Sequence, residues 1–373
     1  MSTRTETPVS APTGHPQLTV DLTAVAANVR TLVNRSDAEL MAVVKADGFG
    51  HGAAAVARTA LAHGASRLGV TSIDEALELR TSGLTAPMLS WLNSVDAPFD
   101  AAVAAGVDLA VPSREHLDAI VARATGARVH LHLDVGMARD GAAPVDWPAL
   151  CRAASLAEWR GLLRVVGVMG HLGCADHPAD PCNATGRARF AWGVETARAA
   201  GLRPSLRHLA ATSAMLTDRR THHSMVRVGA GLVGIDPSRT VRLEPTLTLT
   251  APVVTVRYVR AGTPVGYGHA WTALAGTYLA LLPLGYADGL PRAASGRAEV
   301  LVGGRRRPIV GMISMDQVVV DLGADPVVPG ETVTVFGPGD DGEPTVADWA
   351  VWAGTIEHEI VTGIGPRVAR RTR

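Results

Sequence analysis

A strand-sized apolar segment followed by an alanine-rich helical segment recurs about every 20–30 residues through most of the chain. Helices are expected, for example, at 51–63, 73–81, 114–124 and 184–201. Strands are expected at 40–45, 67–70, 87–91, 108–111, 128–135, 165–171, 206–211 and 225–228. Eight strands that alternate with helices predict a parallel sheet, and this number favours a closed (β/α)8 TIM-type barrel over an open sheet.

The pattern changes after about residue 238, where helical segments nearly vanish. Short β-branched segments bounded by Gly, Pro or Asp follow at 246–259, 277–283, 298–302, 307–313, 318–322 and 332–336. They predict a mainly antiparallel β-domain, with one helix near 346–353. We therefore expect a flexible tail over 1–16, an α/β barrel over 17–240 that includes a first short strand at 18–22, and a C-terminal β-domain over 241–373.

Composition excludes several classes of protein. Lys+Arg and Asp+Glu are both 35 and aromatic residues make up 4%, so neither a basic nucleic-acid surface nor a base-stacking platform is indicated. The three cysteines indicate no disulfide framework and fit a reducing cytoplasm. The polar N-terminus does not resemble a signal peptide, and no apolar run reaches the roughly 18 residues of a membrane span. We expect a cytoplasmic protein that binds neither nucleic acid nor membrane.

Lys45 stands where the apolar strand at 40–45 leaves the core for a glycine-rich turn. Burial disfavours the charged ammonium and lowers the pKa of a lysine. A partly neutral amine can attack a carbonyl group and form an imine. The plainer interpretation is a lysine whose side chain merely leaves the core for solvent.

The segment around Lys45, VKADGFGHG at 44–52, resembles the pyridoxal-phosphate attachment motif of the alanine racemase family. Further segments resemble that family in order along residues 17–370. They are DVGMAR at 134–139, VMGHLGCAD at 168–176, RHLAATS at 207–213, RVGAG at 227–231, VGYGH at 265–269, LGYADGLPR at 284–292, SMDQ at 314–317, EHEIVT at 357–362 and PRV at 366–368.

The resemblance implies a racemase that interconverts L- and D-alanine, a cell-wall precursor, by a two-base mechanism with Lys45 and Tyr267 as catalytic residues. It also implies a homodimer in which Tyr267 and Met315 face the partner's Lys45. The substrate carboxylate is assigned to Arg139 and to the backbone around Met315. The residues assigned to pyridoxal 5′-phosphate are Lys45, Phe49, His171, His208, Thr212, Arg227, Gly229 and Ala230.

Within this set, the resemblance assigns distinct roles. His171 leads towards Tyr267, while His208 and Thr212 belong to the phosphate cradle. Glycines near Gly229 would let backbone N–H groups approach the phosphate. Arg227 would bond the pyridine nitrogen. Because arginine cannot accept the pyridine proton, the ring would be a weak electron sink, which favours simple proton return over transamination.

Five positions depart from the usual family pattern. Phe49 and Val233 replace tyrosines, Ala211 replaces an asparagine and Met312 replaces an arginine. His132 stands where many members carry a carbamylated lysine that positions Arg139. These departures leave open a racemase for another small amino acid.

Plainer and competing interpretations remain for several of these residues. Arg139 could be a solvated loop residue, His171 and His208 could be structural, and Tyr267 could be a half-buried strand aromatic. A zinc cluster of His171, Cys174, His177 and Cys182 has the spacing of no common finger, so no metal site is expected.

Two further alternatives concern the function as a whole. GAGLVG at 229–234 matches G-x-G-x-x-G, but Pro237 follows where a dinucleotide site needs a helix. A non-catalytic pyridoxal-phosphate carrier would resemble only the N-terminal half, so the β-domain and Tyr267 argue against it.

Overall fold

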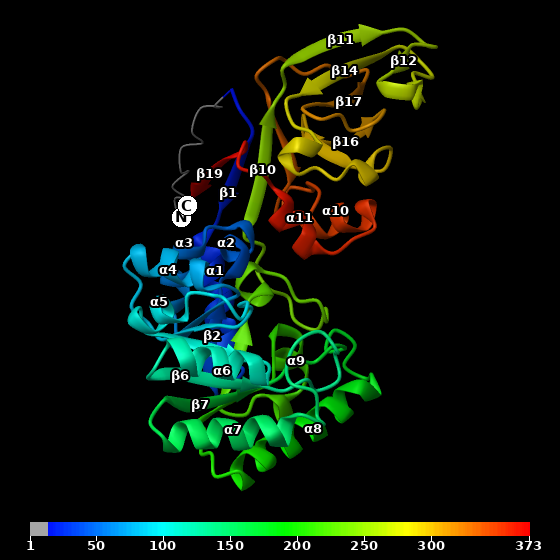
Figure 1. The fold of residues 1–373 in the computed structure, drawn as a ribbon. Coiled ribbons are helices and arrows are strands. Elements are labelled where there is room, and N and C mark those ends of the chain that lie inside the picture. Colours follow the sequence, from blue (N-terminus) through cyan, green and yellow to red (C-terminus); the bar gives the residue numbers. More distant parts are fainter. Residues whose placement is uncertain (1–13) are drawn as a thin grey trace, which may run out of the picture. The chain divides into compact units, whose positions relative to one another are not determined.

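The computed structural model describes residues 14–373, which divide into two compact units (Figure 1). We call Leu22–Glu244 the barrel. The second unit, the β-domain, combines Pro245–Arg373 with residues 14–21. Most of the tail expected at 1–16 lies outside the described residues.

The barrel consists of eight parallel strands in the spatial order β8-β7-β6-β5-β4-β3-β2-β9. The Arg227 N–H donates to the Ala210 carbonyl (3.0 Å), and the Ser224 N–H donates to the Arg207 carbonyl (3.2 Å), so that β9 and β8 nearly close the ring. The predicted (β/α)8 fold is confirmed. The strands are β2 (Glu39–Val43), β3 (Arg67–Val70), β4 (Met88–Ser90), β5 (Val107–Val111), β6 (Ala127–His132), β7 (Leu163–Met169), β8 (Leu206–His208) and β9 (Met225–Val228).

Helices surround these strands (Figure 1). Local signals begin several of them; Ser72, for example, accepts a hydrogen bond from the Glu75 N–H (3.1 Å) in a capping box that starts α4. No helix in residues 14–373 is long and apolar enough to cross a membrane. The barrel helices are α1 (Leu22–Val33), α2 (Lys45–Gly50), α3 (Ala53–Ala62), α4 (Ile73–Thr81), α5 (Phe99–Ala104), α6 (Arg114–Arg123), α7 (Trp147–Trp159), α8 (Pro181–Ala199) and α9 (Thr212–Thr217), with 3-10 turns η1 (Arg219–Thr221) and η2 (Ala230–Val233).

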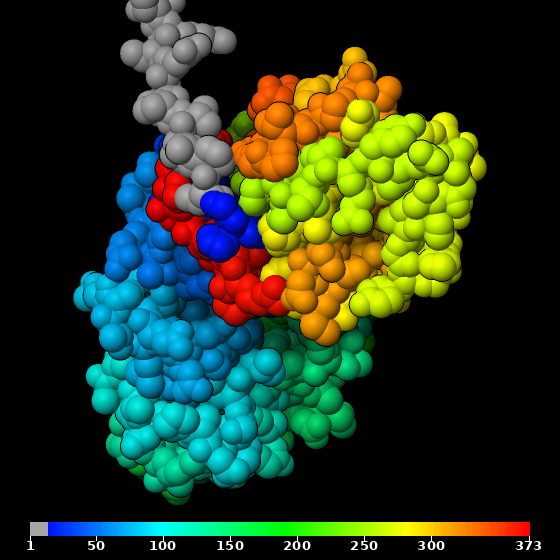
Figure 2. All heavy atoms as spheres, turned by 90° about the horizontal axis from the view of Figure 1, so that it is seen from above, coloured from blue at the N-terminus to red at the C-terminus, as the bar shows by residue number. Residues whose placement is uncertain are grey.

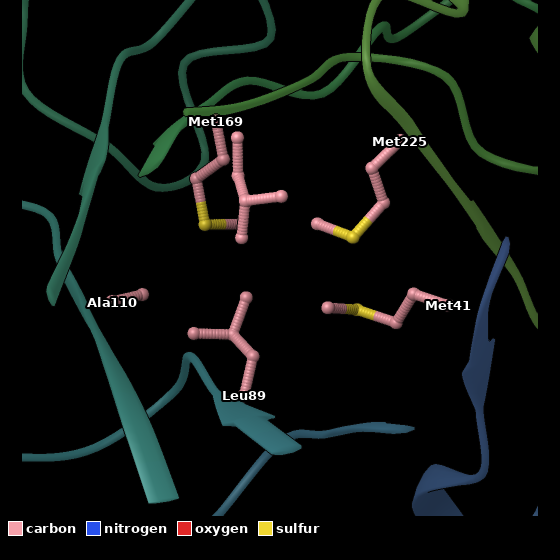
Figure 3. Packing of buried hydrophobic residues seen from close by; sticks show 6 residues of the cluster. Met41, Leu89, Ala110, Met169 and Met225 are labelled. Atoms are coloured by element: carbon pink, nitrogen blue, oxygen red, sulfur yellow. The ribbon is translucent and has the colours of Figure 1, made fainter. Parts of the chain in front are cut away.

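Apolar side chains fill one layer of the barrel interior (Figure 3). They come from β2, β4, β5, β7, β8 and β9 and point towards one another; the residues are Met41, Leu89, Ala110, Met169, Leu206 and Met225. Both faces of these strands are covered, and all five residues of β5 are buried. This explains why the barrel strands read as continuous apolar runs rather than as alternating patterns.

The β-domain is built on a nine-stranded sheet in the order β11-β14-β17-β16-β15-β18-β10-β1-β19. Its pairs are antiparallel except for β1 with β19. The strands are β1 (Gln17–Val20), β10 (Leu247–Pro252), β11 (Thr255–Val259), β14 (Thr277–Leu282), β15 (Glu299–Val302), β16 (Arg305–Val310), β17 (Val318–Gly323), β18 (Thr332–Phe336) and β19 (Ala369–Thr372), beside the pair β12 (Pro264–Val265) and β13 (Trp271–Thr272).

Short helical elements complete the β-domain, and the helix expected near 346–353 is confirmed as α10. They are α10 (Val346–Ala353), α11 (Glu357–Gly363), η3 (Tyr267–His269), η4 (Tyr286–Asp288) and η5 (Arg292–Ala294).

The prediction that a strand at 18–22 belongs to the barrel is wrong. Leu18 pairs with Leu249 of β10 on one side and with Arg370 of β19 on the other. Figure 2 shows the first described residues, in dark blue, beside the red C-terminal residues. The burial pattern fits the β-domain sheet, because β1 alternates between buried and half-buried residues. This is expected for a sheet with one face more buried than the other. The barrel strands β2, β5 and β9 do not alternate in this way.

Candidate active site

Lys45 opens a turn of left-handed helix, α2. Ala46, Asp47, Gly48 and Phe49 all have φ between 52° and 62°. This conformation costs a residue with a side chain about 1–2 kcal/mol, so the surrounding structure must hold it.

Two carboxylates hold the turn in place. Glu75, at the start of α4, accepts a hydrogen bond from the Ala46 N–H (2.7 Å). Asp47 accepts one from the Ala53 N–H at the start of α3 (2.8 Å). The strained backbone next to Lys45 is therefore fixed by neighbouring helices, which sets where the lysine leaves the strand.

The Lys45 side chain is half-buried, and its pKa is lowered by burial and by the positive charge of Arg139, against an opposing effect of Glu75. Its amine is therefore easier to deprotonate than that of an ordinary lysine. Lys45 is also the only lysine among the 373 residues. A single lysine in the whole sequence was a further sign of a special role, which the prediction from motifs did not use.

Several predicted site residues follow the carboxyl ends of barrel strands and so lie at one end of the barrel. Lys45 follows β2, Arg139 follows β6, His171 follows β7, Thr212 follows β8 and Gly229 follows β9. In a (β/α)8 barrel this end carries the functional residues.

Arg227 of β9 points into the barrel and is only 5% exposed. Its Nη1 donates to the His208 carbonyl (2.8 Å) and to His208 Nδ1 (3.0 Å), and its Nη2 donates to the Gly170 carbonyl (2.7 Å). Burial lowers its pKa to about 10, so it remains charged near neutral pH. No carboxylate of residues 14–373 lies within ion-pair distance of this guanidinium.

His171 lies beside Arg227. Its Nδ1 is 3.3 Å from Arg227 Nη2. Burial and the Arg227 charge lower the His171 pKa to about 3, so the imidazole is neutral. Since arginine can only donate, Nδ1 must be the acceptor, and the proton of His171 resides on Nε2.

His208 does not lie in the phosphate cradle where we expected it. The side chain is fully buried, with Nδ1 at Arg227 and Nε2 only 2.8 Å from His130 Nδ1. Both ring nitrogens are therefore occupied inside the barrel and neither is left for a phosphate. Burial and nearby positive charge lower its pKa well below the usual value.

Sequence reasoning also missed His130 and Asp108, which continue this buried network. His130 Nε2 lies 3.3 Å from Asp108 Oδ2. A polar residue inside each of two apolar strands was the available signal, because buried polar groups require partners.

Thr212, Gly229 and Ala230 lie where the starts of α9 and η2 meet. Thr212 Oγ1 accepts from the Gly231 N–H (3.2 Å) and joins the start of α9 to η2. Ala211 provides no side-chain cap to α9. A side chain at Gly229 would place its Cβ 2.6 Å from the Phe49 ring, so glycine is required where the buried ring of Phe49 packs.

The loop that carries Arg139 is shaped by Asp134. Its carboxylate accepts hydrogen bonds from the Gly136, Met137 and Ala138 N–H groups at 2.8–3.2 Å. Arg139 itself is exposed. His132 Nδ1 is buried without a hydrogen-bond partner and lies 3.3 Å from Asp140 Oδ2, next to Arg139 in the chain.

In the β-domain, Tyr267 and Met315 are 72% and 53% exposed. Tyr267, Met312, Ser314 and Gln317 line a cavity of about 390 Å³. Tyr267 is thus an exposed residue of a turn and not a half-buried strand aromatic.

The C-terminal motifs noted in the sequence meet next to Met315. The Ala287 N–H donates to the Met315 carbonyl (2.9 Å), and the Arg367 guanidinium bridges Asp288 (3.1 Å) and Asp316 (2.6 Å). The backbone around Met315 is therefore held rigidly within the β-domain.

Two alternative interpretations of the sequence concern a dinucleotide site and a zinc cluster. Residues 229–234 leave β9 into the 3-10 turn η2 and not into the helix that a dinucleotide site needs. In the zinc alternative, Cys174 and Cys182 gather with Asp180, whereas His171 is occupied by Arg227.

Comparison with known proteins agrees with this arrangement. A family model for the N-terminal domain of alanine racemase matches residues 20–237, and one for the C-terminal domain matches residues 246–372. The alanine racemase of Frankia casuarinae is 47% identical over 363 residues, which cover 94% of both chains. That of Thermobifida fusca is 45% identical over 359 residues, 94% of this chain and 96% of the relative.

Solved structures match over nearly the whole chain. Alanine racemase from Streptomyces lavendulae has a TM-score of 0.94 at 40% identity and covers 99% of this chain and 98% of its own. Alanine racemase from Bartonella henselae, solved with covalently bound pyridoxal phosphate, has a TM-score of 0.88 at 25% identity and covers 97% of this chain and 100% of its own. The chain therefore belongs to the alanine racemase family.

Proposed function

We propose that this chain is a pyridoxal 5′-phosphate-dependent racemase that interconverts L- and D-alanine. The observation that carries the proposal is the amine of Lys45, with its depressed pKa, at the same end of a barrel that holds the buried Arg227. Such an amine attacks carbonyl groups readily. Membership of the alanine racemase family supplies the substrate class.

The residues at this end of the barrel fit the cofactor. Lys45 would hold its aldehyde carbon, and Thr212 with the Gly229 and Ala230 N–H groups would hold its phosphate, where α9 lacks a side-chain cap. Arg227 would donate to its ring nitrogen, a fit for a buried guanidinium without a carboxylate partner. When bound, the cofactor withdraws electrons from the substrate α-carbon and makes its proton removable.

Arg227 would also determine the outcome of the reaction. A guanidinium can donate a hydrogen bond to the ring nitrogen but cannot give it a proton or take one away. Its pKa of about 10 keeps it charged at the working pH. The weak electron sink that results favours prompt return of a proton to the α-carbon, which is racemisation.

Racemisation needs acid–base groups on opposite faces of the substrate, because a single base returns the proton to the face it came from. Lys45 Nζ is assigned to the α-proton of D-alanine, and Tyr267 of the partner subunit to that of L-alanine. A free phenol, with a pKa near about 10, is a poor base at neutral pH. The neutral His171 has its Nε2–H available to stabilise the phenolate, so it would bring the tyrosine into its working range.

The substrate carboxylate is assigned to Arg139 and to the backbone around Met315. The planar fork of arginine suits a carboxylate, and Arg139 is exposed at the end of the barrel that carries Lys45. Met315 would come from the β-domain of the partner subunit, since it and Tyr267 lie on exposed turns.

A head-to-tail homodimer follows from these assignments. Each subunit would provide Lys45 to one site and Tyr267 to the other, a contact made twice by two-fold symmetry. The three cysteines are free and no mechanistic role requires a disulfide, which supports a cytoplasmic enzyme. The C-terminal domain, which its family model matches over residues 246–372, disfavours a non-catalytic carrier.

A related substrate is the second candidate. Met312 lines the cavity beside Tyr267 where the family usually carries arginine, so the surroundings of the substrate differ from the usual pattern. Racemisation rates for a panel of small L- and D-amino acids would distinguish alanine from its neighbours in size.

Substitution of Lys45 tests the function directly. The wild-type protein should bind one pyridoxal phosphate per chain, absorb in the near-visible range and racemise alanine. Lys45→Arg keeps the charge but loses the attacking amine, so it should lose both the absorbance and the activity. Because the chain has no other lysine, borohydride reduction followed by peptide mapping should place the cofactor on Lys45. Absence of binding at saturating cofactor, or activity in Lys45→Arg, would contradict the proposal.

Mixed dimers test the shared site. Lys45→Ala and Tyr267→Phe should each lose about 10²-fold or more of the racemisation rate. Subunit exchange between them should restore one working site in each mixed dimer. Tyr258→Phe, a change at another exposed tyrosine of the β-domain, should remain active and serves as the control. If native mass spectrometry shows exchange and no activity returns, Tyr267 and Lys45 do not act across subunits.

Restoring the usual tyrosine at Phe49 tests the cofactor cradle. The Phe49 ring packs against Gly229, and a hydroxyl there would donate to the phosphate. A hydrogen bond to a charged group contributes about 1.5–3 kcal/mol, so Phe49→Tyr should lower the dissociation constant of the cofactor roughly tenfold or more. Phe49→Leu keeps an apolar residue without the hydroxyl and should bind no tighter than wild type. Equal affinity of Phe49→Tyr and wild type in equilibrium dialysis would contradict this role.

A further inference from the structure

A line of hydrogen bonds crosses the barrel interior from Arg227 to Asp108. His208 Nδ1 lies 3.0 Å from Arg227 Nη1, His208 Nε2 lies 2.8 Å from His130 Nδ1, and His130 Nε2 lies 3.3 Å from Asp108 Oδ2. All four residues are at most 5% exposed. The roles proposed above use Arg227 but leave His130 and Asp108 without a purpose.

The donors and acceptors along this line can be assigned in only one way. Arg227 donates, so His208 Nδ1 accepts, and a neutral His208 carries its proton on Nε2. That proton faces His130 Nδ1, which must therefore accept. His130 then carries its own proton on Nε2 and donates it to the carboxylate of Asp108. A protonated His130 would set two N–H groups against each other, so the line requires a neutral ring.

The charges around the line agree with this assignment. Burial lowers the pKa of His130 despite the opposing effect of Asp108, and the nearby Arg67 and Arg128 add to the lowering. Burial alone would raise the pKa of Asp108, but its hydrogen bonds with His130 and Arg128 bring it below the usual value. Asp108 therefore remains an acceptor at neutral pH, while His130 and His208 remain uncharged.

The backbone is built to bring His130 into this position. The register of β6 against β7 shifts between Val129 and His130, an irregularity of the kind that redirects a side chain. The residue paired with His130 is Gly167, and any side chain there would overlap the imidazole ring. Two independent features of the strands thus make room for the His130 ring inside the barrel.

We propose that Asp108 and His130 are positioning residues that hold His208 as its Nε2–H tautomer, and through it hold Arg227. With the wrong tautomer, a proton on His208 Nδ1 would face the guanidinium and push it away from the site. The role of Arg227 towards a cofactor ring rests on the proposed function. The pattern of protons from Arg227 to Asp108 does not.

Histidine-selective ¹⁵N labelling of the protein as purified tests the proposal without reference to activity. Long-range ¹H–¹⁵N spectra distinguish protonated from unprotonated ring nitrogens. His208 and His130 should both carry the proton on Nε2 at neutral pH. The opposite tautomer of His208, or a charged His130, would overturn the proposal. Because this measurement needs no substitution, it remains decisive even if a variant fails to fold.

Matched variants then test the consequence. His130→Leu removes the acceptor for His208, whereas His130→Asn keeps an oxygen near the place of Nδ1. His130→Leu should lose the slowly exchanging His208 Nε2–H signal and, in the enzyme with cofactor, lower kcat on the order of tenfold, because a buried donor is left unpaired. His130→Asn should recover both. As the control, Arg114→Ala removes an exposed arginine that pairs with Asp118 and has no part in this line, so it should match wild type.

Unchanged His208 signals and unchanged kcat in His130→Leu would overturn the positioning role. A protein that shows the expected tautomers but racemises no amino acid would support the positioning of Arg227 while refuting the proposed function. The two ideas can therefore fail separately.

Discussion

The site depends on a positive charge buried inside the barrel. Arg227 is closed off from solvent, has no carboxylate partner among residues 14–373, and is held by carbonyl oxygens and two imidazoles. Because a guanidinium only donates, it sets the tautomer of each neighbouring histidine. His171 is left with its proton on Nε2, and His208 with one that faces His130 inside the barrel. One fixed donor thus determines which ring nitrogen carries the proton in both neighbouring histidines.

Lys45 is set up by a different kind of constraint. A left-handed turn, held by Glu75 and Asp47, fixes the backbone where the lysine leaves β2. Partial burial and the charge of Arg139 then lower the pKa of its amine. The Lys45 amine is thus more easily deprotonated, as nucleophilic attack requires. Arg227 remains charged, as a fixed hydrogen-bond donor must.

Local patterns predicted much of this molecule. All eight barrel strands were readable because strands covered on both faces are continuous apolar runs, and α10 was readable from its own segment. The placement of β1 could not be predicted from local patterns, because its partners β10 and β19 lie far along the chain. A strand of four residues carries too little sequence information to identify them. Likewise, the link from Asp108 through His130 to His208 joins different strands, and the positive φ values at Ala46 and Phe49 run against residue preference.

The central claim is that Arg227 donates to the ring nitrogen of the cofactor and leaves it without a proton. The most direct measurement is the ¹⁵N chemical shift of pyridoxal phosphate labelled at that nitrogen and bound to the enzyme. At neutral pH the shift should be that of an unprotonated pyridine accepting a hydrogen bond. The shift of a protonated pyridinium would contradict the account, because a protonated ring nitrogen has no lone pair with which to accept a hydrogen bond from the guanidinium.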